Sequence, residues 1–124
     1  MKTIGSIVFL FLFQIYGYSQ NKPKIEFKYL NWDFGKVEFK NDTLVAVFPF
    51  TNKSKDTLNL FVKGFTNFLT FDYNREIIGF QSGSIIVKYY NPNPGAINKS
   101  IVIQTNDPEN QSVVLRIKGE TYKK

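Results

Sequence analysis

Cysteine and histidine are both absent from the 124 residues of the chain. Without cysteine there is no disulfide and no thiol nucleophile. Without either residue there is no Cys/His zinc site, no histidine-ligated haem and no acid–base pair built on imidazole. The sequence also lacks a sustained helical period and any low-complexity tract. We therefore expect a non-enzymatic protein that holds no metal or cofactor and depends on its hydrophobic core alone.

The rest of the composition is that of a basic globular protein. Hydrophobic residues make up 43% of the chain, and 16 Lys and Arg against 10 Asp and Glu give a formal charge of +6. The lysines are scattered and form no stripe or cluster beside exposed rings, so no nucleic-acid partner is expected. Lysines at the edges of strands also discourage edge-to-edge aggregation.

The N-terminal residues have the pattern of a secretory signal peptide. Lys2 is followed by a short apolar run, and Gly17 and Ser19 place small residues at the −3 and −1 positions of a cleavage site. The apolar run is shorter than the roughly 20 residues that span a bilayer. The sequence predicts a signal peptide over residues 1–19 and an exported domain over residues 20–124, periplasmic or extracellular, with no membrane span.

Mass spectrometry of the exported protein is expected to find Gln20 at the N-terminus, free or cyclised to pyroglutamate. Signal peptidase cleaves after the small residue at −1, which is Ser19 in this chain. An envelope-associated chain that still begins at Met1 would contradict the predicted leader.

Short stretches of alternating apolar residues, separated by turn signals, recur along the rest of the chain. The expected strands cover residues 25–29, 44–50, 58–62, 68–73, 85–89, 101–103 and 113–117, with a break of the first strand at 34–35 and extended chain at 37–39. About seven strands without a helix predict an all-β fold, an immunoglobulin-like β-sandwich. A small barrel such as an OB-fold is the alternative.

The alternation also predicts the core and one irregular strand. The residues expected to be buried are Phe48, Phe50, Leu58, Val87, Ile101, Ile103 and Leu115. Pro49 lies within one of the predicted strands, and proline has no N–H for a β-ladder. That strand is therefore expected to lie at an edge or to carry a bulge.

Several spaced pieces of the sequence resemble a known bacterial family. They are residues 34–37 (FGKV), 48–52 (FPFTN), 83–87 (GSIIV), 94–95 with 99–106 (PG, KSIVIQTN) and 115–119 (LRIKG). In this order they resemble the family called domain of unknown function 1573, which is common in Bacteroidetes and related to the immunoglobulin-like ASPM-SPD-2-Hydin domains. The resemblance covers residues 30–121 and implies an exported β-sandwich without an established activity.

The chain departs from this family in one segment. Members usually carry a Cys-Gly-Cys-like segment after the third strand, whereas residues 64–70 of this chain contain no sulfur. A redox or metal role attached to those cysteines therefore does not carry over.

Aromatic residues gather in one stretch that is the main candidate for a binding surface. Within sixteen residues lie Phe65, Phe68, Phe71, Tyr73 and Phe80. Such rings can form a platform that stacks on a sugar or a partner protein. They can equally fill the core and cap its end. We expect at least two of them to be exposed and close to one another.

Two pairs of carboxylates are weak candidates for chemistry. Asp72 and Glu76 flank Arg75, but nothing predicts the cleft that a glycosidase needs. Asp107 and Glu109 could offer oxygen ligands to calcium, although a pair is too few, and an Asx turn is the preferred interpretation.

Two threonines are candidate modification sites. Thr43 and Thr57 each lie in the Asp-Thr-aliphatic pattern that exported Bacteroidetes proteins use for O-glycosylation. Both fall where a turn leads into a predicted strand, so an enzyme could reach them.

Taken together, these patterns predict an exported immunoglobulin-like module that binds or scaffolds a protein or glycan of the bacterial cell envelope. One alternative is a carbohydrate-binding module, which needs exposed aromatic rings. Another is a chaperone-like periplasmic partner that binds by adding a strand to an open sheet edge.

Overall fold

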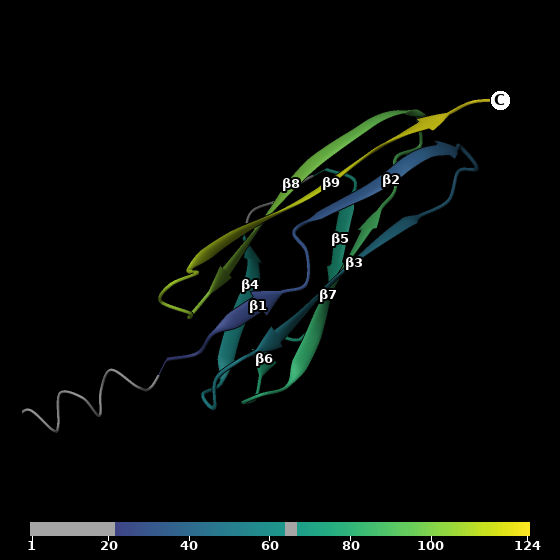
Figure 1. Cartoon of the computed structure of the whole chain (residues 1–124). Helices are drawn as coiled ribbons and strands as arrows, with labels where there is room; N and C mark the ends of the chain where they lie inside the picture. The colour runs from purple at the N-terminus through teal and green to yellow at the C-terminus, as the bar shows by residue number, and fades with distance from the viewer. Residues whose placement is uncertain (1–21, 64–66) are drawn as a thin grey trace, which may run out of the picture.

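The computed structural model describes residues 22–63 and 67–124, so the predicted signal peptide 1–19 and its cleavage site before Gln20 lie outside the described residues. The described residues form nine strands and no helix (Figure 1). The strands are β1 (Ile25–Phe27), β2 (Asn31–Glu38), β3 (Leu44–Asn52), β4 (Leu58–Lys63), β5 (Leu69–Asp72), β6 (Glu76–Ile77), β7 (Ser82–Tyr89), β8 (Gly95–Thr105) and β9 (Ser112–Tyr122).

The strands make a two-layer sandwich, which confirms the predicted all-β, immunoglobulin-like class. One sheet has the order β1-β3-β7-β5 and the other the order β2-β9-β8-β4-β6. Neighbouring strands are antiparallel except β2 and β9, which run parallel. The described strands number nine and not about seven, because the first predicted strand is divided between the sheets and the two-residue β6 is too short to produce an alternation.

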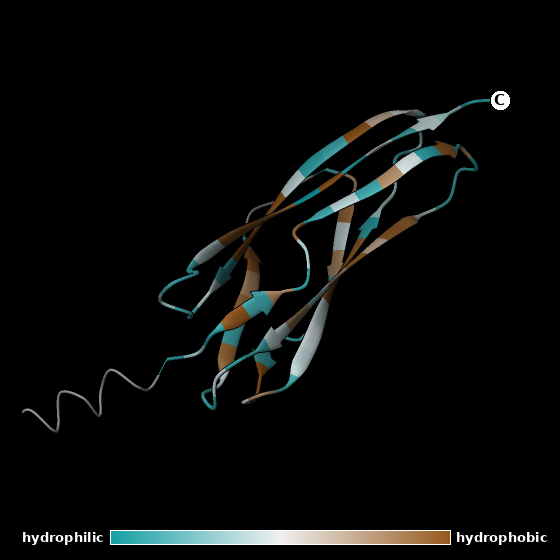
Figure 2. Cartoon of the chain, in the orientation of Figure 1, coloured by the Kyte–Doolittle hydropathy of each residue, from teal (hydrophilic) through white to brown (hydrophobic). Residues whose placement is uncertain are grey.

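The core lies between the sheets and consists of the residues that the alternation predicted. All seven residues expected to be buried are at most 2% exposed. Hydrophobic and hydrophilic segments alternate along the strands in Figure 2, as expected when every second side chain faces the opposite sheet. The predicted register is therefore correct in both sheets.

Pro49 ends the pairing between β1 and β3. The N–H of Lys28 donates to the carbonyl oxygen of Pro49 at 3.0 Å, but proline has no N–H with which to return the bond. The chain leaves the first sheet at this point and enters the second, where the N–H of Arg116 donates to the oxygen of Leu30 at 2.9 Å. β3 is therefore an inner strand over residues 50–52, where β1 and β7 both pair with it, and an edge over residues 44–48, so the edge predicted from Pro49 holds for the part of the strand before it.

The expected strand break at residues 34–35 is wrong. Gly35 lies inside β2, at a bulge where the register with β9 shifts between Asp33 and Lys36. Its φ is 71°, in the left-handed region that glycine adopts without strain, and its N–H donates to Asp33 Oδ1 at 2.8 Å. The glycine bends the strand but does not end it.

Asp107 confirms the predicted Asx turn and also has a distant partner. Its Oδ1 accepts the N–H of Glu109 at 2.9 Å within the turn. Its Oδ2 accepts the N–H of Ile25 at 2.9 Å and the side-chain amide of Asn110 at 3.1 Å. The carboxylate, which is buried, therefore attaches the start of β1 to the turn between β8 and β9.

Candidate functional site

The structure does not bring the five candidate rings together. Phe65 lies outside the described residues. Phe68 is 44% exposed and its carbonyl oxygen accepts the N–H of Tyr90, whereas Phe80 is 67% exposed and precedes the other end of β7. The eight residues of β7 separate the two rings by about 25 Å at roughly 3.3 Å per residue. The expected proximity is therefore wrong, because the two rings border opposite ends of one strand.

The two candidate rings that lie between Phe68 and Phe80 in the sequence pack against the core. Phe71 and Tyr73 are half-buried and pack against the core residues. The hydroxyl of Tyr73 also accepts the N–H of Val62 at 2.9 Å. A platform shared by all the rings is thus absent from the described part of the chain, and any role in binding falls to Phe68 and Phe80 separately.

The candidate threonines have the accessibility that modification needs. Thr43 precedes β3 and Thr57 precedes β4, and both are exposed. O-glycosylation at either residue stays a prediction.

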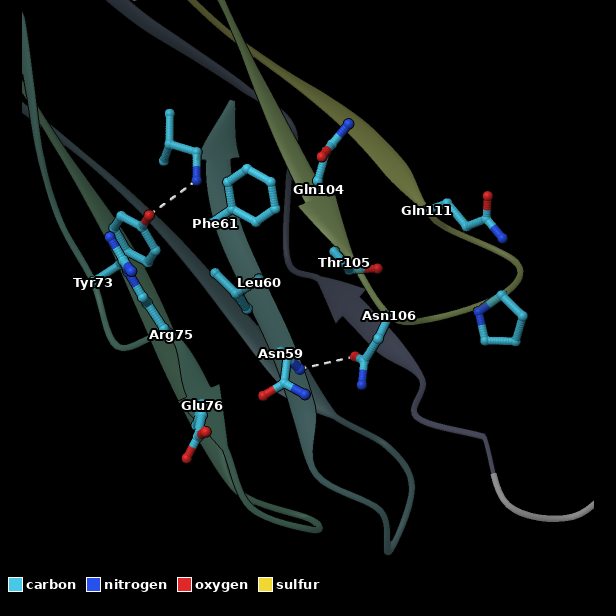
Figure 3. Close-up of a pocket in the computed structure, with 12 residues that line it drawn as sticks. Asn59, Leu60, Phe61, Tyr73, Arg75, Glu76, Gln104, Thr105, Asn106 and Gln111 are labelled. Carbon is cyan, nitrogen blue, oxygen red and sulfur yellow. Dashed lines mark hydrogen bonds between the residues drawn. The ribbon is translucent and has the colours of Figure 1, made fainter. Parts of the chain in front are cut away.

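An open groove runs along β4 on the outer side of the five-stranded sheet (Figure 3). Its volume is about 700 Å³. The side chains that give it chemical character come from β4, β6, β8 and the turns beside them: Asn59, Phe61, Arg75, Glu76, Gln104 and Gln111. Three of these side chains are amides, so the groove offers neutral hydrogen-bond donors and acceptors around one aromatic ring.

The position of Phe61 follows from the alternation of β4. Leu58 and Leu60 point into the core and are at most 2% exposed, so Asn59 and Phe61 must point outward. Phe61 is 46% exposed and lies opposite Gln104 on β8. This ring was not among the candidates predicted from the sequence. The available signal was an aromatic residue at a position where the strand alternation calls for a polar one.

The backbone along the groove already has its partners. The N–H of Leu60 donates to the carbonyl of Arg75 at 2.9 Å, and the N–H of Val62 donates to the Tyr73 hydroxyl. Asn106 accepts the N–H of Asn59 through Oδ1 at 2.8 Å (Figure 3). A ligand in this groove would therefore meet side chains, because these donors of the β4 edge are already bonded.

The carboxylates do not assemble into a reacting pair. Asp72 lies on β5 and Glu76 on β6, which belong to different sheets. Across residues 22–63 and 67–124 no group of three or more Asp, Glu, His or Cys side chains could hold a metal ion. Among the described residues that line the groove, Glu76 is the one carboxylate.

The N-terminal segment that places β1 in one sheet and β2 in the other, the last strand β9 parallel to β2, and the packed core define an immunoglobulin-like, PapD-like β-sandwich. The chain belongs to the family described as "Protein of unknown function (DUF1573)", whose model matches residues 25–121. No helix in the described part of the chain is long and apolar enough to cross a membrane.

Many solved structures match this fold, two of which illustrate it. A protein of unknown function from Porphyromonas gingivalis W83 is 18% identical with a TM-score of 0.65, and the match covers 82% of this chain and 48% of that one. PapD-like domain 7 of human CEP192 is 10% identical with a TM-score of 0.62, and the match covers 83% and 88%. This chain thus spans about half the length of the Porphyromonas protein. A comparison with curated proteins found no match.

Proposed function

We propose that the chain is an exported, non-enzymatic immunoglobulin-like module that binds a glycan of the bacterial cell envelope in the groove along β4. The observation that carries this proposal is the set of amide side chains around the exposed ring of Phe61. The signal-peptide pattern supports the location, and the lack of histidine, cysteine and a carboxylate pair in the groove supports binding without catalysis.

The chemistry of the groove matches a sugar. Asn59, Gln104 and Gln111 each present an N–H₂ donor and a carbonyl acceptor, and sugar hydroxyls both donate and accept hydrogen bonds. The exposed face of Phe61 gives an apolar surface on which the C–H face of a sugar ring can lie. Arg75 and Glu76 add one charge of each sign, and both can form charge-assisted hydrogen bonds with sugar hydroxyls.

A second candidate function is strand addition at the open edge of β3. The N–H of Asn52 donates toward β7 at 2.9 Å, so the alternation of the ladder directs the N–H groups of Val45 and Val47 to the opposite, open side. An extended peptide could pair with these groups. The Tyr29 hydroxyl already donates to the carbonyl of Val47 at 2.7 Å, which removes one acceptor from that edge.

Replacing Phe61 by alanine is expected to weaken glycan binding by roughly tenfold or more, because burial of one large ring contributes about 1.5–3 kcal/mol. Retardation in native gels cast with envelope polysaccharides, such as O-antigen or exopolysaccharide, measures the affinity. Tyr122→Ala is the matched control, since this ring is 43% exposed but lies at the end of β9 and outside the groove. The melting temperatures of both variants should stay close to that of the parent.

Val47→Pro distinguishes the two candidate functions. Its N–H points away from β7, so a proline there leaves the existing ladder intact, as Pro49 does, but removes a donor from the open edge. Polysaccharide retardation that is unchanged in Phe61→Ala, together with capture of an envelope protein that is kept in Phe61→Ala and lost in Val47→Pro, would refute the groove and support strand addition.

A further inference from the structure

The turn between β6 and β7 presents an apolar tip at one end of the sandwich. Ile78 is 64% exposed and Phe80 is 67% exposed, which makes them the most exposed large hydrophobic residues of the described chain. They belong to the three-residue segment 78–80, which we call the apolar tip. In Figure 1 the tip lies beside the turn that joins β3 to β4, at the lower end of the molecule.

The tip is held in place by several hydrogen bonds. The N–H of Phe80 donates to the carbonyl of Ser54 at 3.0 Å, and the N–H of Gln81 donates to the carbonyl of Ile78 at 3.2 Å. The buried amide of Asn52 donates to the carbonyl of Ile77 at 3.1 Å. The exposed side chains are therefore fixed on a supported turn.

The backbone of Phe80 is strained, and its ring is exposed. Its φ is 62°, in the left-handed region that bulky side chains rarely adopt and that costs of order 1–3 kcal/mol. Glycine or asparagine would occupy this position with less strain. Strain combined with exposure of a large ring is a pattern found at functional sites.

Three lysines lie on the backbone segments that support the apolar tip. The N–H of Lys53 donates to the carbonyl of Lys24 at 2.7 Å, and Gly79 packs against the backbone of Lys55. All three lysines are exposed, and the salt bridge found within the described residues lies elsewhere, between Lys118 and Asp33.

Three carboxylates and one arginine lie near these lysines. Glu26 is exposed on β1, and Asp56 is half-buried in the turn that carries Lys53 and Lys55. Arg75 and Glu76 are exposed next to each other just before the tip, so their charges cancel. The three lysines against Glu26 and Asp56 therefore leave an excess of positive charge around the apolar tip.

We propose that the apolar tip docks the domain onto a lipid bilayer that carries negative charge. Ile78 and Phe80 would enter the boundary between headgroups and acyl chains, and Lys24, Lys53 and Lys55 would lie among the lipid phosphates. Two side chains on a projecting turn offer far less contact area than the roughly 800 Å² per partner of a stable protein interface. A bilayer needs no complementary pocket and matches both the apolar and the basic parts of this surface.

Co-sedimentation with lipid vesicles tests this proposal on the protein purified as exported. Binding is expected to be strong to mixed phosphatidylglycerol and phosphatidylcholine and weak to phosphatidylcholine alone. The double variant Ile78→Ser with Phe80→Asn should lose at least roughly tenfold in affinity for the mixed vesicles, because it removes two inserted apolar side chains. Asparagine is chosen at position 80 because it tolerates a positive φ, so the turn keeps its conformation.

Two further variants separate the contributions. Lys53→Ser with Lys55→Ser should remove the preference for phosphatidylglycerol and the sensitivity of binding to salt. Val114→Ser with Tyr122→Ser is the matched control, since it removes two exposed apolar side chains of β9 that lie outside both the tip and the groove and should leave vesicle binding unchanged.

Three results would overturn the proposal. They are equal binding to neutral and charged vesicles, vesicle binding that survives the change of Ile78 and Phe80, and envelope association that depends on these residues without any vesicle binding. The last result would assign the tip to a protein partner. The glycan groove is tested with Phe61→Ala in the absence of lipid, so failure of one proposal leaves the other measurable.

Discussion

Replacing Phe50 by alanine is expected to lower the free energy of unfolding by about 3–5 kcal/mol. Phe50 is 2% exposed, and its ring centroid lies 5.5 Å from that of Phe27. Its cross-strand partner is Gly83, and a Cβ added there would lie 2.9 Å from Phe50 Cζ. The ring thus occupies the space that Gly83 leaves open, and alanine would leave a cavity that a rigid two-sheet core cannot close.

Chemical denaturation of Phe50→Ala and Phe61→Ala measures this effect. The two variants carry the same substitution, one between the sheets and one on the outer side of a sheet. Phe61 is 46% exposed, so its truncation should change the free energy of unfolding by only about 0.5 kcal/mol or less. Equal losses in the two variants would mean that the inward and outward positions of these strands are assigned wrongly.

Replacing Asp107 by alanine is expected to destabilise the fold by roughly 2–3 kcal/mol. The change removes the acceptor for the buried N–H of Ile25 and for two groups of its own turn. A buried donor without an acceptor retains its full desolvation penalty, which explains why a single carboxylate has such an effect. Hydrogen exchange should show faster opening at Ile25, and unchanged protection there would contradict the role of Asp107 at the start of β1.

Asp107 also makes the stability depend on pH. Burial raises the pKa of its carboxyl group, but hydrogen bonds from Ile25, Asn110 and Glu109 outweigh burial and lower the pKa below the ordinary value of 3.8. The unfolded chain therefore binds a proton at a higher pH than the folded chain does.

The contribution of Asp107 to stability is complete when the pH is above the ordinary pKa of 3.8. It is lost as the pH falls through the lower pKa of the folded chain. Asp107→Asn cannot titrate, so unfolding by urea across the acidic range should show a weaker pH dependence for this variant. Parallel profiles for the variant and the parent would refute this assignment.

The core could be predicted from the sequence because its signal is local. Alternation within one strand determines which side chains share a face, and this placed Phe48, Ile103 and Leu115 inside without knowledge of their partners. The pairing of β2 with β9 joins segments about 85 residues apart, and no local pattern specifies it. For the same reason the first strand was predicted to continue to residue 29, whereas β1 ends at Phe27. Its pairing with β3 decides where it ends.

The candidate site could be predicted only in part. Phe68 and Phe80 are exposed, which agrees with the expectation that at least two of the rings would be. They are close in the sequence but far apart in the fold. The rigid length of β7 separates them. Phe61, the ring that does line a groove, comes from the regular strand β4 and not from the stretch in which aromatic residues are concentrated.

The parallel pairing of β2 with β9 has a mechanical consequence. The described chain enters the sandwich beside β1 at one end and leaves it after Tyr122 at the other (Figure 1). Tension between these ends would draw β2 and β9 in opposite directions along their shared axis, from the pair Asn31 and Arg116 to the pair Glu38 and Tyr122. In this shear geometry the hydrogen bonds between the strands must rupture together, whereas a hairpin peeled from its open end loses them one at a time. The domain can therefore transmit a pulling force along its length before it unfolds.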